Sequence, residues 1–112
     1  ERPVPVCADE SVHDRASLSE LVGRYDAVNI KLDKTGGLTE ALAVARAAHA
    51  AGMGVMVGCM AGTSLSMAPA FVIGTLSNWS DLDGPLLLAS DRPAPMTYAA
   101  GALSRFTPAL WG

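Results

Sequence analysis

The feature of this sequence that most restricts its fold is a regular alternation of short apolar stretches with longer stretches of helical character. Apolar stretches that predict strands begin near residues 4, 27, 55 and 79, so they lie 23 to 28 residues apart, and a helix is predicted in each interval. Strands and helices that alternate at this spacing favour right-handed βαβ units and a parallel sheet. The chain is therefore predicted to have an α/β fold.

Four such units are half of an eight-stranded barrel, so we predict half of a (β/α)8, TIM-like barrel with parallel strands. A half barrel leaves two strand edges open, which is costly unless another segment covers them. The sequence also begins directly against the first predicted strand, without an initiator methionine. We therefore expect a fragment whose partner strands lie outside the sequence. Residues 1–90 would form the βα units, and residues 91–112 a C-terminal return segment.

The predicted helices follow from capping residues and apolar stripes. Ser17 and Glu20 fit a capping box that opens a short helix. Residues 38–51 form the strongest predicted helix, because a stripe of small apolar residues follows one face and Gly52 is placed as a left-handed cap. The predicted elements are strands at 4–8, 28–32, 54–60 and 79–83, with the third covered on both faces, and helices at 17–25, 38–51 and 64–76.

Composition indicates a small folded domain and excludes some classes of partner. Half of the 112 residues are apolar and the net charge is −3, so neither nucleic acid nor an anionic membrane is an expected partner. Cys7 and Cys59 have neither metal-binding nor redox spacing, and no signal peptide is visible, so we expect a cytoplasmic protein. Between Arg46 and Asp81 no residue is charged, which predicts buried interior or a subunit contact in a homo-oligomer.

Lys31 occupies an unusual place for a lysine. In the predicted strand around it, Val28, Ile30 and Leu32 fall on one side, while Asn29 and Lys31 fall on the other. An ammonium is normally kept in water unless something pairs with it or uses it. Lys31 would stand near the carboxyl end of its strand, where α/β proteins place their chemistry. If desolvated, Lys31 could lose its proton near neutral pH and act as a base.

Acidic residues fall at the same end of other predicted strands. Asp9 and Glu10 follow the first strand, and Asp9 is suited to a hard cation such as Mg²⁺. Asp81 and Asp83 lie two residues apart on the fourth, so their carboxylates point the same way in an extended segment and favour a bound cation between them. Together with Lys31, these residues predict proton abstraction next to a carboxylate, with a metal for that carboxylate and an acidic pair for a remote ammonium.

Each of these residues also has an ordinary structural explanation. Asp9-Glu10 would be a solvated strand end, Lys31 an exposed lysine of an edge strand, and the acidic pair part of a turn. Cys59 and Met60, at the carboxyl end of the third predicted strand, are most often core residues. The stretch Lys34-Thr35-Gly36-Gly37 suggests phosphate binding, but it lacks the spacing of a P-loop.

Four segments of the chain occur in the order found in a known enzyme family. They are Ala8-Asp9-Glu10-Ser11, residues 29–38, Gly58-Cys59-Met60 with Thr63-Ser64, and Asp81-Leu82-Asp83-Gly84-Pro85. In these segments the chain resembles the C-terminal half of the barrel in the enolase superfamily, specifically the dipeptide epimerases of the L-Ala-D/L-Glu epimerase type. The lysine segment followed by Asp-x-Asp is the most specific part, since the acidic pair separates these epimerases from the superfamily's cycloisomerases and synthases.

The resemblance implies a role for each matched residue. Asp9 would be the last of three Mg²⁺ ligands, and Lys31 one of two acid/base lysines on opposite sides of the substrate α-carbon. Asp81 and Asp83 would bind the free α-ammonium of a dipeptide substrate. At the third strand, the residues implied to contact the substrate are Cys59, Met60 and Gly62.

The resemblance also implies parts that are not in this sequence: an N-terminal capping domain, a Lys-x-Lys strand with the second lysine, and strands with the other metal ligands. The return segment would pack on the missing capping domain or a partner. The expected function is part of a Mg²⁺-dependent epimerase that inverts the α-carbon of the C-terminal residue of a dipeptide such as L-Ala-D/L-Glu, in cell-wall peptide recycling. The isolated chain is expected to be inactive.

Two other functions stay open. One is another enzyme of the same superfamily, a cycloisomerase or an o-succinylbenzoate synthase. The other is a non-catalytic α/β module that binds a partner through its open strand edges. The enzyme hypotheses require that the Lys31 amine face Asp9 and Asp81, because only then do the strand ends surround one small substrate.

Overall fold

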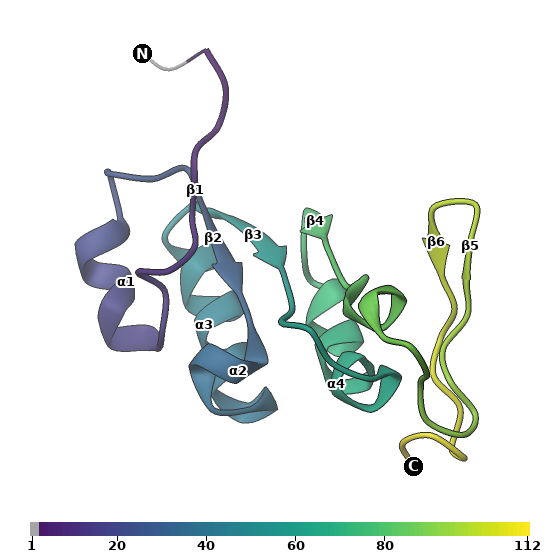
Figure 1. Ribbon diagram of the computed structural model, residues 1–112. Coiled ribbons are helices and arrows are strands. Elements are labelled where there is room, and N and C mark those ends of the chain that lie inside the picture. The colour runs from purple at the N-terminus through teal and green to yellow at the C-terminus, as the bar shows by residue number, and fades with distance from the viewer. Residues whose placement is uncertain (1–2) are drawn as a thin grey trace.

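The computed structural model describes residues 3–112, and a parallel sheet of four strands lies at their centre. The strands follow one another across the sheet in chain order, so each pairs with its neighbour in sequence (Figure 1). This order is the one that consecutive βαβ units produce, and the predicted parallel α/β arrangement is confirmed. The strands are β1 (Cys7–Ala8), β2 (Ala27–Ile30), β3 (Gly54–Val57) and β4 (Trp79–Ser80).

The helices that connect these strands cover one face of the sheet. In β3, Val55 and Val57 are fully buried, whereas Met56, on the opposite face, is only half-buried. The prediction that β3 is covered on both faces is therefore wrong, because consecutive crossovers of one hand place their helices on the same side. The connecting helices within residues 3–112 are α1 (Arg15–Leu21), α3 (Leu38–Ala50) and α4 (Ser64–Gly74).

The first helix begins earlier than predicted. Asp14 is its N-cap, and the Asp14 carboxylate accepts a hydrogen bond of 2.9 Å from the backbone N–H of Ser17. The Ser17 hydroxyl accepts in return from the Asp14 N–H, which completes a capping box. The prediction of Ser17 as the cap with Glu20 is therefore wrong, because Asp14 makes these bonds one turn earlier. The helix ends at Leu21, since Val22 leaves the helical conformation.

The longest helix agrees with its prediction. α3 ends at Ala50, and Gly52 follows in the left-handed conformation with φ of +75°. Ala41, Ala45 and Ala48 are buried, so the stripe of small residues lets α3 lie close to the sheet. In the part of the chain that the structure describes, no helix has both the length and the apolarity to cross a membrane.

The two outer strands are shorter than predicted. β1 covers Cys7–Ala8 instead of residues 4–8, and β4 covers Trp79–Ser80 instead of residues 79–83. Each lies at an edge of the sheet, where a strand has a hydrogen-bonding partner on one side only. Val4, which precedes β1, is 64% exposed, and Trp79 of β4 is 49% exposed.

The chain turns sharply after β2, and this turn positions the two lysines of the chain. Lys31 keeps an extended conformation and precedes α2 (Leu32–Thr35), a single helical turn that the sequence did not predict. Gly36 and Gly37 follow with φ of +76° and +131°, values that residues with a Cβ rarely adopt. They let α3 begin at once, while α2 holds Lys34 one turn beyond Lys31.

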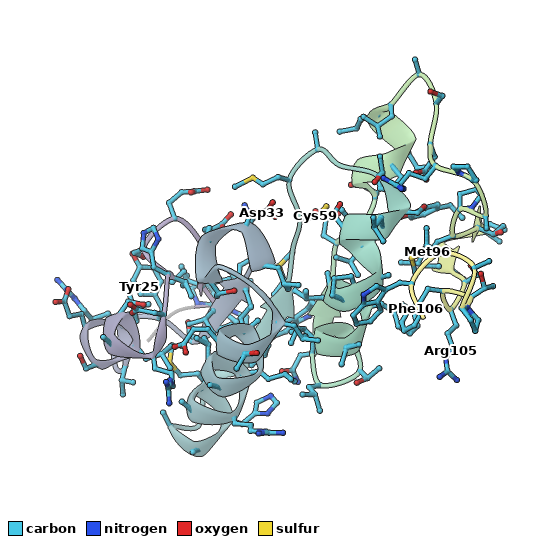
Figure 2. The ribbon with its side chains drawn as sticks, turned by 90° about the horizontal axis from the view of Figure 1, so that it is seen from below. Tyr25, Asp33, Cys59, Met96, Arg105 and Phe106 are labelled. Carbon is cyan, nitrogen blue, oxygen red and sulfur yellow. The ribbon has the colours of Figure 1, made fainter. Side chains whose placement is uncertain are left out.

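The C-terminal segment folds back on α4. The 3₁₀ helix η1 (Gly84–Leu87) follows β4, and an antiparallel hairpin of β5 (Tyr98–Ala99) and β6 (Ala102–Leu103) comes later. Phe106 packs edge-to-face on Phe71 of α4, with ring centroids 6.1 Å apart. Figure 2 shows Met96 and Phe106 beside this helix and Arg105 pointing away from it. The return segment thus packs on this chain, and its contact with a capping domain stays a prediction.

Candidate active site

The carboxyl ends of the four strands surround one cavity of about 300 Å³. Asp9 follows β1, Lys31 follows β2, Cys59 follows β3 and Asp81 follows β4, and all four line this cavity. They meet because parallel strands deliver their ends to the same edge of the sheet. The complete lining consists of Cys7, Asp9, Asn29, Lys31, Met56, Gly58, Cys59 and Asp81.

Asp9 is held between two ammonium groups. Its Oδ2 accepts a hydrogen bond of 3.0 Å from Lys31 Nζ, and its Oδ1 accepts one of 2.7 Å from Lys34 Nζ. The Lys31 side chain is only 12% exposed, and its amine also lies 3.7 Å from an oxygen of Glu10. The Lys31 amine therefore faces Asp9 and a cavity shared with Asp81, which is the arrangement that the enzyme hypotheses require.

The contact between Asp9 and Lys31 favours the charged form of both groups. Burial alone would raise the pKa of Asp9, but hydrogen bonds from Lys34 and Lys31 outweigh it and hold that pKa below its ordinary value. The hydrogen bond to Asp9 raises the pKa of Lys31, although burial acts in the opposite direction. The sequence predicted that a desolvated Lys31 could lose its proton near neutral pH. In the structure the neighbouring Asp9 carboxylate outweighs the effect of burial and favours the ammonium form.

Asp81 and Asp83 border two adjoining spaces. Asp81 lines the 300 Å³ cavity, and both residues line a neighbouring groove of about 680 Å³ between the end of α4, the segment after β4 and the β5–β6 hairpin. Burial first, and then the negative charge of Asp83, raises the pKa of Asp81, whereas the positive charge of Lys31 opposes this rise. A cation between the two carboxylates would remove their mutual repulsion.

At the end of β3, one of the three predicted substrate contacts lines the cavity. Cys59 does so, and burial raises the pKa of its thiol. Seen from below, Cys59 lies next to Asp33 of α2 (Figure 2), whose charge also acts on the thiol. Met60 is 42% exposed and lies outside the lining, and Gly62 packs so closely on Ser66 that a Cβ would come within 2.5 Å of its hydroxyl. Contact of Met60 and Gly62 with substrate stays a prediction.

Two polar residues of this region were not assigned a role from the sequence. Asn29 is 6% exposed, and its Oδ1 has no hydrogen-bond partner among the described residues. Asn29 lies on the same strand face as Lys31, so the alternation in β2 could have identified it. Lys34 contacts Asp9 from α2, and its spacing of three from Lys31 was the available signal. That signal went unused because one helical turn is too short to show a periodicity.

Asp9 has the donor chemistry for Mg²⁺, since it presents hard carboxylate oxygens on the wall of a cavity. Within residues 3–112, however, no group of three His, Cys, Asp or Glu side chains is placed to hold a metal ion. Proteins usually bind Mg²⁺ through one or two carboxylates together with waters or substrate oxygens. Asp9 therefore fits as one protein ligand of a site that the described residues do not complete.

Comparison with known proteins agrees with this geometry. The family described as "Enolase C-terminal domain-like" matches residues 1–104. An N-acetyl-D-glutamate racemase from a Pseudoalteromonas species is 52% identical over 110 residues, which are 98% of this chain and 35% of that protein. The L-Ala-D/L-Glu epimerase of Escherichia coli K12 is 50% identical over 101 residues, which are 90% of this chain and 32% of that protein.

Solved structures of similar proteins contain dipeptides. An enolase family member from Agrobacterium tumefaciens with homology to dipeptide epimerases, bound to sodium and L-Ala-L-Glu, has a TM-score of 0.96 at 54% identity and covers 100% of this chain and 34% of that one. The dipeptide epimerase from Methylococcus capsulatus, complexed with Mg and the dipeptide L-Arg-D-Lys, has a TM-score of 0.81 at 34% identity. The match covers 90% of this chain and 30% of that one.

The chain thus spans about a third of the length of the relatives that it matches. The similarity extends over nearly the whole of this chain and includes the strands that carry Asp9, Lys31 and Asp81. The predicted fold and the resemblance found in the sequence are confirmed, and the chain belongs to the enolase C-terminal domain-like family.

Proposed function

We propose that this chain is part of a Mg²⁺-dependent dipeptide epimerase that inverts the α-carbon of the C-terminal residue of a dipeptide such as L-Ala-D/L-Glu. The observation that carries the proposal is the single cavity that Asp9, Lys31 and Asp81 share, with Lys31 Nζ 3.0 Å from Asp9. The substrate would be a zwitterion with an acidic α-proton. Binding it and removing that proton needs two acids and an amine around one small space, and these residues supply them.

In this proposal each side chain handles a different part of the substrate. Lys31 is the catalytic residue that exchanges a proton with the α-carbon, because its amine faces the cavity from a nearly buried position. Asp81 and Asp83 bind the free α-ammonium, which would remove the repulsion between the two carboxylates. The substrate contacts proposed at the third strand are Cys59, Met60 and Gly62.

Asp9 is the proposed Mg²⁺ ligand of this chain. When bound, Mg²⁺ would hold and polarise the substrate carboxylate and offset the negative charge of Asp9 that now stabilises the Lys31 ammonium. Asp9 is prepared for this role because its carboxylate stays ionised between two ammonium groups.

Inversion also needs parts that the described residues do not supply. A proton removed from one face of the α-carbon must be returned from the other face, and Lys31 reaches the cavity from one strand only. We propose that the second lysine, the remaining metal ligands and a capping domain come from the rest of the polypeptide or from another chain. Residues 1–90 would then be the C-terminal βα units of the barrel, and residues 91–112 the segment that returns to the capping domain.

A related reaction on an N-acylated amino acid is the second candidate. It is favoured by the 52% identity to an N-acetyl-D-glutamate racemase, whose named substrate has an acetyl group where L-Ala-D/L-Glu has an alanyl residue. Such a substrate has no free ammonium for Asp81 and Asp83. The acidic pair, of which Asp81 lines the cavity and Asp83 the neighbouring groove, is therefore the reason to place the dipeptide first.

The test is proton exchange in D₂O with the complete protein and Mg²⁺, using L-Ala-D-Glu, L-Ala-L-Glu and N-acetylglutamate in parallel. Exchange at the glutamate α-carbon of both dipeptides is expected. Exchange with N-acetylglutamate alone would make the chain part of an N-acylamino acid racemase, and no exchange with any of the three would overturn both candidates.

The role of the acidic pair is tested by replacing it. Asp81→Asn and Asp83→Asn are each expected to lower kcat/KM for L-Ala-L-Glu about 10- to 100-fold, because an ammonium loses a charged hydrogen-bond partner. The exposed Glu20→Gln on α1 is the matched control and should leave kcat/KM unchanged. A cycloisomerase or synthase would tolerate both replacements, and unchanged kcat/KM in both variants would contradict the proposed ammonium site.

The proposal extends to the setting of the enzyme. We propose a cytoplasmic protein that acts on peptides from cell-wall recycling and assembles as a homo-oligomer. The free thiols of Cys7 and Cys59 are compatible with a reducing compartment, and exposed apolar side chains such as Trp79 and Leu87 offer surface for further contacts. Fractionation of cells and light scattering of the complete protein test these points.

A further inference from the structure

Lys34 is a buried ammonium with a full set of acceptors. Its side chain is 7% exposed, less than that of Lys31 at 12%. Its Nζ donates to Asp9 Oδ1 at 2.7 Å, to the backbone oxygen of Asp9 at 2.5 Å and to the backbone oxygen of Asn29 at 3.2 Å. An ammonium has three N–H donors, so all of them are used.

These three hydrogen bonds join the ends of two neighbouring strands. Asp9 directly follows β1, Asn29 lies in β2, and Lys34 reaches both from α2. Asp9 and Lys31 line the 300 Å³ cavity, but Lys34 does not. Lys34 therefore holds the Asp9 carboxylate from behind the cavity wall, where it is not placed to exchange a proton with a substrate.

The two carboxylate oxygens of Asp9 are divided between the two lysines. Lys34 Nζ donates a hydrogen bond to Oδ1. Lys31 Nζ lies on the cavity side and donates one of 3.0 Å to Oδ2. The Asp9 carboxylate can rotate about its side-chain bonds. A hydrogen bond to one of its oxygens restricts that rotation. With Oδ1 held by Lys34, Oδ2 is the oxygen that Asp9 presents to anything in the cavity.

We propose that Lys34 is a positioning residue that orients the Asp9 carboxylate toward the cavity and thereby sets the affinity of the site for Mg²⁺. The inference rests on the proposed function for the identity of the cation. Partners of ligating carboxylates contribute substantially to metal binding, and their loss typically lowers metal affinity about 10- to 100-fold.

The experiment is calorimetric titration of the complete protein with Mg²⁺ alone, compared between the wild type and Lys34→Met. Methionine retains much of the apolar stem but removes the ammonium, so the Mg²⁺ Kd is expected to rise about 10- to 100-fold. A higher Mg²⁺ concentration should then restore part of kcat, which a merely structural role would not do. Arg46→Met, on the exposed surface of α3, is the matched control and should leave Kd unchanged.

A conservative variant and a crystal structure distinguish the positioning role of Lys34 from a folding defect. Lys34→Arg restores a positive donor and should recover part of the lost affinity. In a crystal structure of the wild type with Mg²⁺, Lys34 should stay on Asp9 Oδ1 while Oδ2 meets the metal; a metal bound to Oδ1 with Lys34 displaced would overturn the inference. An unchanged Kd in folded Lys34→Met would overturn it as well.

The outcomes also separate this inference from the proposed function. If the wild type binds Mg²⁺ but exchanges no α-proton of either dipeptide, the epimerase proposal fails, and the Kd ratio of Lys34→Met to wild type still decides the role of Lys34. If the wild type exchanges the proton while Lys34→Met binds Mg²⁺ as tightly, the epimerase proposal stands and the role of Lys34 is refuted.

Discussion

Around the strand ends, backbones approach so closely that some glycines leave no room for a side chain. A Cβ on Gly84 would lie 2.6 Å from the backbone oxygen of Met60 and 3.3 Å from Cys59 Sγ. Because the nearest atom belongs to the backbone, it cannot rotate away. This contact holds the segment that carries Asp83 against the loop after β3.

We therefore expect Gly84→Ala to destabilise the complete protein by about 1–3 kcal/mol, the usual cost of overpacking. Equilibrium unfolding in urea measures this change. Gly74→Ala is the matched control, because the atoms nearest to its Cβ would be 3.5 and 3.7 Å away, an ordinary contact. Equal stability of the two variants would mean that the segment after β4 can shift without cost.

At the scale of elements, the turn from α2 to α3 depends on two successive glycines. Gly36 has φ of +76°, in the left-handed region that asparagine also tolerates, whereas Gly37 has φ of +131°, where a Cβ is strained. Gly37→Asn should therefore cost about 1–3 kcal/mol, and Gly36→Asn much less. Urea unfolding of both variants tests this order, and the opposite order would contradict the backbone conformation described here.

The C-terminal segment is attached to α4 by an acid that caps the helix from a distance. Asp91 accepts a hydrogen bond of 2.9 Å from the Ser64 backbone N–H and also pairs with the Ser64 hydroxyl, while Thr63, the N-cap, makes no side-chain cap. Burial alone would raise the pKa of Asp91, but the bonds from Ser64, followed by Arg92, outweigh it and hold that pKa below its ordinary value.

Asp91→Ala should therefore cost about 1 kcal/mol near neutral pH, as the loss of a helix cap does. A lowered pKa in the folded state means that the contribution is present above about pH 4, the pKa of an unfolded aspartate, and is lost as pH falls through the folded value. Unfolding in urea at pH 7 and pH 3 measures it. A difference between wild type and variant that does not shrink in acid would contradict the role of the carboxylate.

On the scale of the whole molecule, the sheet that residues 3–112 form has two open edges and one face that no helix covers. β1 and β4 each pair on one side only, and Trp79 on β4 and Leu86 and Leu87 beyond it are exposed. Unpaired strand edges and exposed apolar side chains favour association with further strands. The cavity that Asp9 and Lys31 line lies at this face, since Asn29 and Met56 also line it.

We therefore expect the isolated 112-residue chain to self-associate and to exchange no α-proton of L-Ala-D-Glu or L-Ala-L-Glu in D₂O with Mg²⁺. Light scattering and proton NMR measure the two properties. The complete protein serves as the positive control for exchange. A stable monomer would favour a non-catalytic binding module, and clear turnover by the isolated chain would defeat the requirement for a second proton donor.

Much of the architecture follows from local patterns in this sequence. The strand and helix spacing, the small-residue stripe of α3 and the left-handed Gly52 depend on periodicity and on backbone conformation, which are properties of neighbouring residues. The start of α1 was missed because Asp14 and Ser17 compete as caps, and the single turn of α2 was missed because one turn has no period. The shortening of β1 could not be predicted, since it depends on a neighbouring strand.

By itself, the sequence determined the parallel α/β fold, the strand ends as the place of chemistry, and Asp9, Lys31 and the acidic pair as the residues to follow. Only the tertiary structure decided that Lys34 shares Asp9 with Lys31, that Asp81 reaches the cavity while Met60 does not, and that the helices leave one face of the sheet uncovered. The physical reason is that alternation along a strand is a local property, whereas partners of a buried charge come from separate strands and depend on how those strands pair.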